Sequence, residues 1–126
     1  RSTPLYSSAA SDVYKRQLHH DLTNNFIAQV VGRKRLKLLP ASEVGRVYNH
    51  LHVFSRIADL EDPTLDGARW PRLPGARVYD VLLEPGEILF VPFGWWHQVK
   101  SVDFSVTVTY TNFLWPNDAY ATYPNG

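Results

Sequence analysis

From residue 18 onward the chain consists of short runs of β-branched, aromatic and other apolar residues, separated by proline, glycine and aspartate. The clearest run, "FSVTVTYTNF", alternates Ser105, Thr107, Thr109 and Thr111 with valine and tyrosine. This period of two is typical of a strand with two different faces. Neither an alternation of helical and strand patterns nor an internal repeat is visible, which disfavours a parallel α/β sheet. The sequence therefore predicts an all-β sandwich or barrel.

Two longer segments contain the expected strands. "NNFIAQVVGRKRLKLLP" predicts two strands joined around Gly32 and bounded by Pro40. "YDVLLEPGEILFVPFGWWHQVKS" predicts a strand, a turn at Pro85-Gly86, a second strand ended by Pro92, and a third strand starting at Trp95. Turn residues thus mark the strand ends along most of the chain.

The remaining segments have a different composition. Residues 41–78 are rich in proline and glycine, and we expect them to form an irregular insert outside the core, with at most a short helix near its start. Residues 1–17 are rich in serine and alanine and show no sustained period, so we expect a non-native or disordered leader. The predicted domain spans residues 18–126.

Composition narrows the classes of function. Thirteen Lys and Arg residues against twelve Asp and Glu give a formal charge of +1, which favours neither a nucleic-acid binder nor a membrane-surface protein. The absence of cysteine excludes disulfides, Cys-ligated zinc, iron–sulfur clusters and thiol catalysis. No apolar run of about 18 residues is present. We expect a soluble intracellular protein, cytoplasmic or nuclear, whose metal ligands, if any, are histidines and carboxylates.

The "HHD" motif at residues 19–21 contains a possible pair of metal ligands. On a strand, side chains two residues apart point the same way, so His19 and Asp21 converge on one face while His20 points to the other. A His-x-Asp pair is common and weak by itself, and a solvated strand end is the better explanation of an isolated motif. A metal site requires a third ligand from elsewhere.

Three histidines could supply this ligand. His50 and His52 lie in the irregular insert, where nothing fixes their direction, whereas His97 begins a strand after a proline-bounded turn. We therefore expect His97 to complete the site. Two histidines and one carboxylate form the facial triad typical of non-haem Fe(II) oxygenases, and zinc is the chemical rival for the same ligands.

Lys34 shares a strand face with Leu36 and Leu38, opposite a basic stripe of Arg33, Arg35 and Lys37. A buried lysine is costly without an anionic partner, so Lys34 either extends to the surface or binds an anion such as a dicarboxylate. The basic stripe is expected to be a solvated strand face, with nucleic-acid contact as the alternative.

Further polar and aromatic residues flank this site. Asn25 and Asn112 could add amide donors, although either could equally be a turn or capping residue. The alternation places Trp95 on the face of His97 and Trp96 on the opposite face, and we expect packing roles for both.

Together, "HHDLTNNFIAQVVGRKRLKLLP", "LEPGEILFVPFGWWHQV" and "VTVTYTNF" resemble the JmjC and cupin-like hydroxylases, especially the asparaginyl-hydroxylase branch. The resemblance covers roughly residues 18–115. It implies a partial double-stranded β-helix, a jelly-roll or cupin-like barrel, that uses Fe(II) and 2-oxoglutarate. It assigns the iron to His19, Asp21 and His97, the distal carboxylate of 2-oxoglutarate to Lys34, and surrounding contacts of this co-substrate to Asn25 and Asn112.

The chain also departs from the family pattern. The family has a threonine three positions before the first metal histidine, and Arg16 stands there. Family members carry an N-terminal region before the metal strand, and we expect this chain to be truncated there, with an inactive fragment as one expected outcome.

The resemblance implies hydroxylation of a protein side chain, coupled to decarboxylation of 2-oxoglutarate to succinate. RNA or a small molecule is a less favoured substrate, and demethylation is a variant outcome. The alternative function is a cupin-like module that binds a metal or ligand without turnover. A zinc hydrolase is a third reading, but it requires a general base, and Glu84 and Glu87 flank a turn and look solvated.

Overall fold

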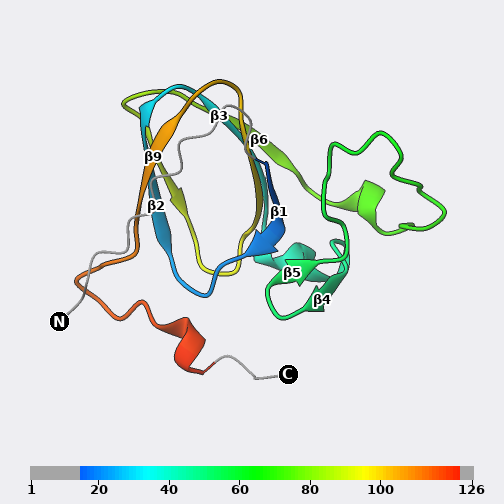
Figure 1. Ribbon diagram of the computed structural model, residues 1–126. Helices are drawn as coiled ribbons and strands as arrows, with labels where there is room; N and C mark the ends of the chain where they lie inside the picture. The colour runs from blue at the N-terminus through cyan, green and yellow to red at the C-terminus, as the bar shows by residue number, and fades with distance from the viewer. Residues whose placement is uncertain (1–14, 123–126) are drawn as a thin grey trace.

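The computed structural model describes residues 15–122, which form two antiparallel β-sheets facing each other (Figure 1). The six-stranded sheet has the order β4-β5-β1-β8-β3-β6 and the three-stranded sheet the order β7-β2-β9. The described residues contain three short 3-10 helices and no α-helix, which confirms the all-β, partial cupin-like prediction. The strands are β1 (Lys15–His20), β2 (Asn25–Val31), β3 (Lys34–Leu39), β4 (Asn49–Leu51), β5 (Phe54–Ser55), β6 (Tyr79–Leu83), β7 (Ile88–Val91), β8 (Trp96–Ser101) and β9 (Val106–Tyr110).

The strands β2 and β3 are consecutive but lie in different sheets. The chain crosses from one sheet to the other at Gly32, whose backbone φ is +67°. A Cβ atom at this position would lie 1.9 Å from the carbonyl oxygen of Phe104, so only glycine fits the corner. The Nε2 atom of Gln29 donates hydrogen bonds to the carbonyls of Val31 and Gly32 and holds the bend. The chain crosses again between β6 and β7, at the predicted Pro85-Gly86 turn.

The inner core lies between the two sheets. Leu36 and Leu38 of β3 and Leu83 of β6 pack against Val91 of β7, and Trp95 joins them at the edge. Lys34 is also buried on this face, while Arg33 and Arg35 on the opposite face are exposed. The predicted alternation of β3 is therefore confirmed, and it places one lysine inside the barrel.

A second core lies on the outer face of the six-stranded sheet, under the insert. Leu18, Leu39 and Trp96 from the sheet pack against Val47 of the insert, and all four are buried. The insert begins with the 3-10 helix η1 (Ala41–Gly45), as predicted, and also contains β4, β5 and η2 (Leu73–Gly75). The expectation that the insert lies outside the core is therefore wrong, because its apolar side chains bury this face of the sheet.

One polar cluster holds the insert together, and a second joins it to the sheet. The buried carboxylate of Glu43 accepts hydrogen bonds from Arg46 and Arg77, at 2.9 and 3.1 Å. On β8, the buried side chain of Gln98 donates to the carboxylate of Asp59 at 2.7 Å and accepts from the backbone amide of Leu60 at 2.8 Å. Gln98 follows His97, so the insert holds the strand that carries this histidine.

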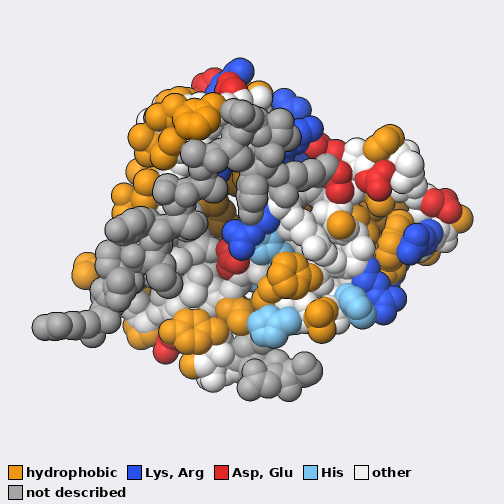
Figure 2. All heavy atoms as spheres, in the orientation of Figure 1, with side chains coloured by type: hydrophobic (Ala, Val, Ile, Leu, Met, Phe, Trp, Pro, Cys, Tyr) orange, Lys and Arg blue, Asp and Glu red, His pale blue; other side chains and the backbone are white. Residues whose placement is uncertain are grey.

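The outer face of the three-stranded sheet is apolar and exposed. Phe26 lies directly opposite Phe90 and Tyr110 in the two neighbouring strands, and Phe113 stacks on Phe26 with ring centroids 5.4 Å apart. Hydrophobic side chains accordingly gather over β2 and β9 in Figure 2. Beyond this sheet the chain continues to the 3-10 helix η3 (Ala119–Ala121).

The expected leader only partly overlaps the described residues. Lys15, Arg16 and Gln17 form the first half of β1 and pair with β8, whereas the prediction for residues 1–14 lies outside the described part of the chain. Among residues 15–122, no helix has the length and apolar character needed to cross a membrane.

Candidate metal centre

Two neighbouring strands bring the predicted histidines together. In the antiparallel pair β1–β8, His19 lies directly opposite His97, so both imidazoles project from the same face of the sheet. Their ring centroids are 4.3 Å apart, and both side chains are buried. Residues 78 positions apart in the sequence thus become adjacent through strand register alone.

Backbone carbonyl groups orient both rings. The Nδ1 atom of His19 lies 2.6 Å from the carbonyl oxygen of Gln17, and that of His97 lies 3.0 Å from the carbonyl oxygen of Trp95. Each Nδ1 therefore carries the hydrogen, and each Nε2 faces Asp21. Metal-binding histidines commonly show this arrangement, because the second nitrogen is held by a hydrogen bond.

Asp21 completes the cluster from the loop that follows β1. Its Oδ1 atom lies 3.7 Å from Nε2 of His19, and its Oδ2 atom lies 3.3 Å from Nε2 of His97. One ligand atom from each of the three residues lies within 4.8 Å of the others. Among the described residues, these are the three that converge in this way, and they match the predicted triad.

The ionisation of the cluster suits a cation. Burial, followed by the nearby His97, lowers the pKa of His19 to about 4. Burial raises the pKa of Asp21, but the adjacent imidazoles, first His97 and then His19, outweigh it, so this pKa lies below its ordinary value. At neutral pH the centre therefore offers a neutral imidazole at His19 and a carboxylate at Asp21.

One buried atom of the cluster lacks a hydrogen-bond partner. The Nε2 atom of His19 has no solvent exposure and no donor or acceptor within reach. Buried polar atoms are rarely left unpaired in folded proteins, and such exceptions often mark a bound ion. The lone pair of His19, the carboxylate of Asp21 and the Nε2 atom of His97 form a two-histidine, one-carboxylate donor set. This set fits Fe(II), with open positions remaining for other ligands.

The other histidines lie elsewhere. His20 points to the opposite face, where its ring packs edge-on against Trp96 with centroids 4.8 Å apart. His50 and His52 are exposed in the insert and do not join the cluster. Trp95 packs in the inner core and Trp96 in the outer one, as the alternation predicts. Glu84 and Glu87 are exposed, as expected.

The residues assigned to the co-substrate occupy three different environments. Lys34 is buried on the inner face, and burial lowers its pKa. Within residues 15–122 no carboxylate pairs with it. Asn25 is buried at the start of β2 and contacts Asp21, whereas Asn112 is exposed after β9. The structure thus brings Asn25, but not Asn112, into contact with a residue of the triad.

The loop that carries Asp21 is held by residues that the sequence analysis did not single out. The Oδ1 atom of Asn117 accepts a hydrogen bond from the backbone amide of Asn24 at 2.7 Å, and its Nδ2 atom donates to the carbonyls of Asn24 and Thr111. Asn24 in turn accepts from the backbone amide of Phe93. Nothing local distinguishes Asn117 from a surface asparagine, because its partners lie 93 and 6 residues away.

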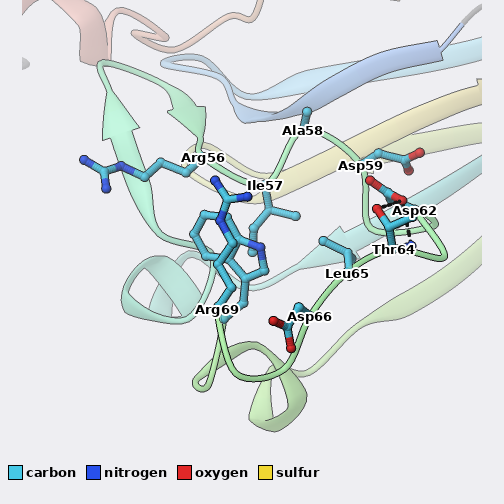
Figure 3. A pocket seen from close by; sticks show the side chains of 10 residues that line it. Arg56, Ile57, Ala58, Asp59, Asp62, Thr64, Leu65, Asp66 and Arg69 are labelled. Atoms are coloured by element: carbon cyan, nitrogen blue, oxygen red, sulfur yellow. Dashed lines mark hydrogen bonds between the residues drawn. The ribbon is translucent and has the colours of Figure 1, made fainter.

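The insert contains a separate polar pocket of about 340 Å³, shown in Figure 3. The guanidinium of Arg69 lies over the Trp70 ring on one side of it, 5.1 Å from the ring centroid. On the other side, Asp59 and Asp62 accept hydrogen bonds from nearby backbone amides. None of the triad residues lines this pocket, so it is distinct from the candidate metal centre.

Comparison with known proteins shows the family to which the chain belongs. Residues 8–116 match the cupin-like domain family. Over 97 residues, the chain is 36% identical to lysine-specific demethylase 8 of Xenopus tropicalis, covering 74% of this chain and 21% of that protein. Over 107 residues, it is 36% identical to tRNA wybutosine-synthesizing protein 5 of Mus musculus, covering 82% of this chain and 32% of that protein.

A solved structure supports the fold. Hydroquinone 1,2-dioxygenase from Sphingomonas sp. TTNP3, with 4-hydroxybenzoate bound, superposes with a TM-score of 0.52 at 12% sequence identity, covering 82% of this chain and 56% of that one. The chain spans only 21% and 32% of the lengths of the two relatives named above. The family match extends over both sheets and all three triad residues, and the chain therefore belongs to the cupin-like domain family, in its JmjC-related group.

Proposed function

We propose that this domain is an Fe(II)- and 2-oxoglutarate-dependent dioxygenase that hydroxylates a protein side chain. The observation that carries the proposal is the convergence of His19, Asp21 and His97, with the buried Nε2 atom of His19 left without a hydrogen-bond partner. When bound, iron would supply the oxidative chemistry, with O2 as the oxidant: one oxygen atom would enter the hydroxyl group and the other succinate, as 2-oxoglutarate loses CO2. The chain's own residues hold and orient the reactants.

Lys34 would bind the distal carboxylate of 2-oxoglutarate. Along the β3–β8 pair, Leu38 lies opposite His97 and Lys34 lies opposite Ser101, so Lys34 and His97 share the inner face. Four residues of strand separate these two positions, which corresponds to about 13 Å. A lysine side chain and a five-carbon dicarboxylate together can span this distance. The buried ammonium gains the counter-charge that the described residues do not provide.

Two features support the co-substrate assignment at this end of the barrel. The surrounding inner surface is polar but uncharged, since the hydroxyls of Ser101 and Ser105 lie 3.2 Å apart and that of Thr107 donates to Gln29. All of these side chains are buried. They leave Lys34 as the one fixed positive charge on the described inner face, which favours an anionic group beside it.

The substrate assignment rests on the relatives and on the formal charge of the chain. One relative is named a lysine-specific demethylase and another a tRNA wybutosine-synthesizing protein, so protein and RNA substrates both occur among similar proteins. A protein side chain is favoured here because the formal charge of the chain is only +1. Demethylation of a protein side chain would use the same centre.

The proposal is tested by measuring succinate formation from 2-oxoglutarate with added Fe(II). We expect turnover that is lost in His19→Ala, which removes a ligand. Lys34→Met should raise the 2-oxoglutarate KM by about 30-fold or more, because truncating one partner of a buried charge pair costs roughly 2 kcal/mol or more. Arg35→Met is the matched control, since Arg35 is an exposed cation on the other face of β3.

Turnover that survives both His19→Ala and Lys34→Met would contradict the proposal. Binding of Fe(II) and 2-oxoglutarate without succinate formation would instead support the alternative, a cupin-like module that binds both ligands without catalysis. The same triad supports that reading, because ligand binding needs the donor atoms but not a competent substrate site.

A further inference from the structure

The carboxylate of Asp21 lacks the support that the two histidines have. His19 and His97 lie on paired strands, and a backbone carbonyl fixes each ring. Asp21 instead follows the end of β1, and its side chain is 34% exposed. The backbone of its loop is held, for example by the hydrogen bond from the amide of Gly94 to the Asp21 carbonyl at 3.1 Å. That bond does not determine how the carboxylate is turned.

Asn25 supplies the missing contact. Its Nδ2 atom donates a hydrogen bond to the Oδ2 atom of Asp21 at 2.7 Å. Asn25 is only 4% exposed and belongs to β2, so it reaches the metal loop from the three-stranded sheet. A hydrogen bond to a charged acceptor, shielded from water, is among the stronger polar contacts that a protein can make.

A second hydrogen bond holds the oxygen end of the Asn25 amide, whose NH2 group is directed by the acceptor-only carboxylate of Asp21. The hydroxyl of Thr23 donates to the Oδ1 atom of Asn25 at 3.1 Å. With its oxygen engaged by Thr23, the amide presents its NH2 group to Asp21. The reversed orientation would place the amide oxygen against the carboxylate and the NH2 group against Thr23, and would leave Asp21 without this donor.

From these contacts we propose that Asn25 is a positioning residue of the metal centre, which sets the orientation of Asp21 so that the carboxylate presents one oxygen to the ion. This inference rests on the proposed metal centre. It differs from the co-substrate role that the family resemblance implies for Asn25, because the partner of the Asn25 amide is a carboxylate of the triad. The Thr23–Asn25–Asp21 chain of hydrogen bonds therefore belongs to metal binding.

The test measures Mn(II) affinity by isothermal titration calorimetry in the absence of 2-oxoglutarate. We expect Asn25→Ala to weaken Mn(II) binding by about 10- to 100-fold, the usual effect of removing a residue that supports a metal ligand. Asn25→Asp should weaken it at least as much, because a second carboxylate would face Asp21. Thr23→Val, which leaves the amide in place but frees it to turn, should have a smaller effect of the same sign.

The matched control is Asn49→Ala. Asn49 is an exposed asparagine in β4 whose amide donates to the carbonyls of His52 and Phe54, away from the triad. Its removal should leave the Mn(II) affinity unchanged. Because Asn25 is buried, its substitution could unfold the chain, so thermal unfolding of each metal-free variant shows whether that variant is folded. The Co(II) absorption spectrum of Thr23→Val then reports the geometry of the metal ligands directly.

Two results distinguish a failure of the Asn25 proposal from a failure of the proposed metal centre. If Mn(II) binds the parent chain and is lost in His19→Ala, while Asn25→Ala binds Mn(II) as tightly as the parent and loses only 2-oxoglutarate affinity, the positioning role is wrong and the metal centre stands. If the parent chain binds no Mn(II), both the proposed centre and the role of Asn25 are wrong.

Discussion

At the scale of single residues, two adjacent histidines have unrelated roles. His19 faces the inside of the barrel and meets His97, while His20 faces outward and packs against Trp96. The difference follows from the strand alternation alone, since neighbouring side chains point to opposite faces. Both rings are buried, and burial lowers the pKa of each. Burial alone therefore does not identify a ligand, whereas the position of Nε2 opposite Asp21 does.

The lowered pKa of His19 predicts acid sensitivity of the metal-free protein. The pKa is about 4 in the folded chain and about 6.5 in the unfolded one, so between these values only the unfolded chain binds the proton. The free energy of unfolding should therefore fall as the pH drops from 6.5 to 4, by up to about 3 kcal/mol. Urea unfolding with a metal chelator present, at several pH values, measures this slope.

A variant without this imidazole should respond less to pH. His19→Gln should reduce the fall in the free energy of unfolding between pH 6.5 and 4. His50→Gln, at an exposed position in the insert, should show the same fall as the parent chain. Equal slopes for the parent and His19→Gln would show that another group causes the acid sensitivity.

At the scale of elements, the corners between the sheets decide the architecture. The strands β2 and β3 are joined by two residues, a length that usually makes a hairpin. Here they lie in different sheets, and the bend at Gly32 sends the chain across the barrel. The result places Asn25 and Lys34, nine positions apart, on facing sheets around the same interior. Because of this corner, residues from both sheets surround the triad.

Three glycine-to-alanine substitutions test separately the two reasons for a glycine at a corner, which are a positive φ and a lack of space for a Cβ atom. Gly32→Ala combines a positive φ with contact to the Phe104 carbonyl and should lower the free energy of unfolding by about 2 to 4 kcal/mol. Gly86→Ala has the positive φ but open space around the added Cβ, and should cost about 1 to 2 kcal/mol. Gly67→Ala has neither and should be neutral to within about 0.5 kcal/mol. Denaturant unfolding that gave equal effects for all three would contradict this account of the corner.

At the scale of the whole molecule, the six-stranded sheet packs against other parts of the chain on both faces. Its inner face packs against the three-stranded sheet and its outer face against the insert. Strand β8 contributes to both layers, with His97 facing inward and Trp96 facing outward. The hydrogen bonds of Gln98 to Asp59 and Leu60 continue the outer contact. The insert therefore supports strand β8 on the side opposite the candidate metal centre.

Loss of the outer core should weaken the whole domain. Trp96 is 1% exposed, and Trp96→Ala should lower the free energy of unfolding by about 3 to 5 kcal/mol, the usual cost of truncating a buried tryptophan. Trp115→Ala is the matched control, because that tryptophan is 57% exposed and should cost less than about 1 kcal/mol. Chemical denaturation followed by circular dichroism compares them. Similar losses for the two variants would show that the insert does not form a core with the sheet.

From its turn residues, its period of two and the chemistry of its side chains, the sequence predicts the longer strands of both sheets, their faces and the three candidate ligands, but not the short strands β4 and β5. It also placed Lys34 among leucines, which the structure confirms. The tertiary structure alone decided that β2 and β3 belong to opposite sheets, that the insert forms a second core, and that Asn25 contacts Asp21. The pairing of His19 with His97 also depends on the tertiary structure, since it requires the register of strands far apart in the sequence. Local patterns report the direction of a side chain relative to its own strand, whereas the neighbour that it meets depends on the long-range packing of the whole barrel.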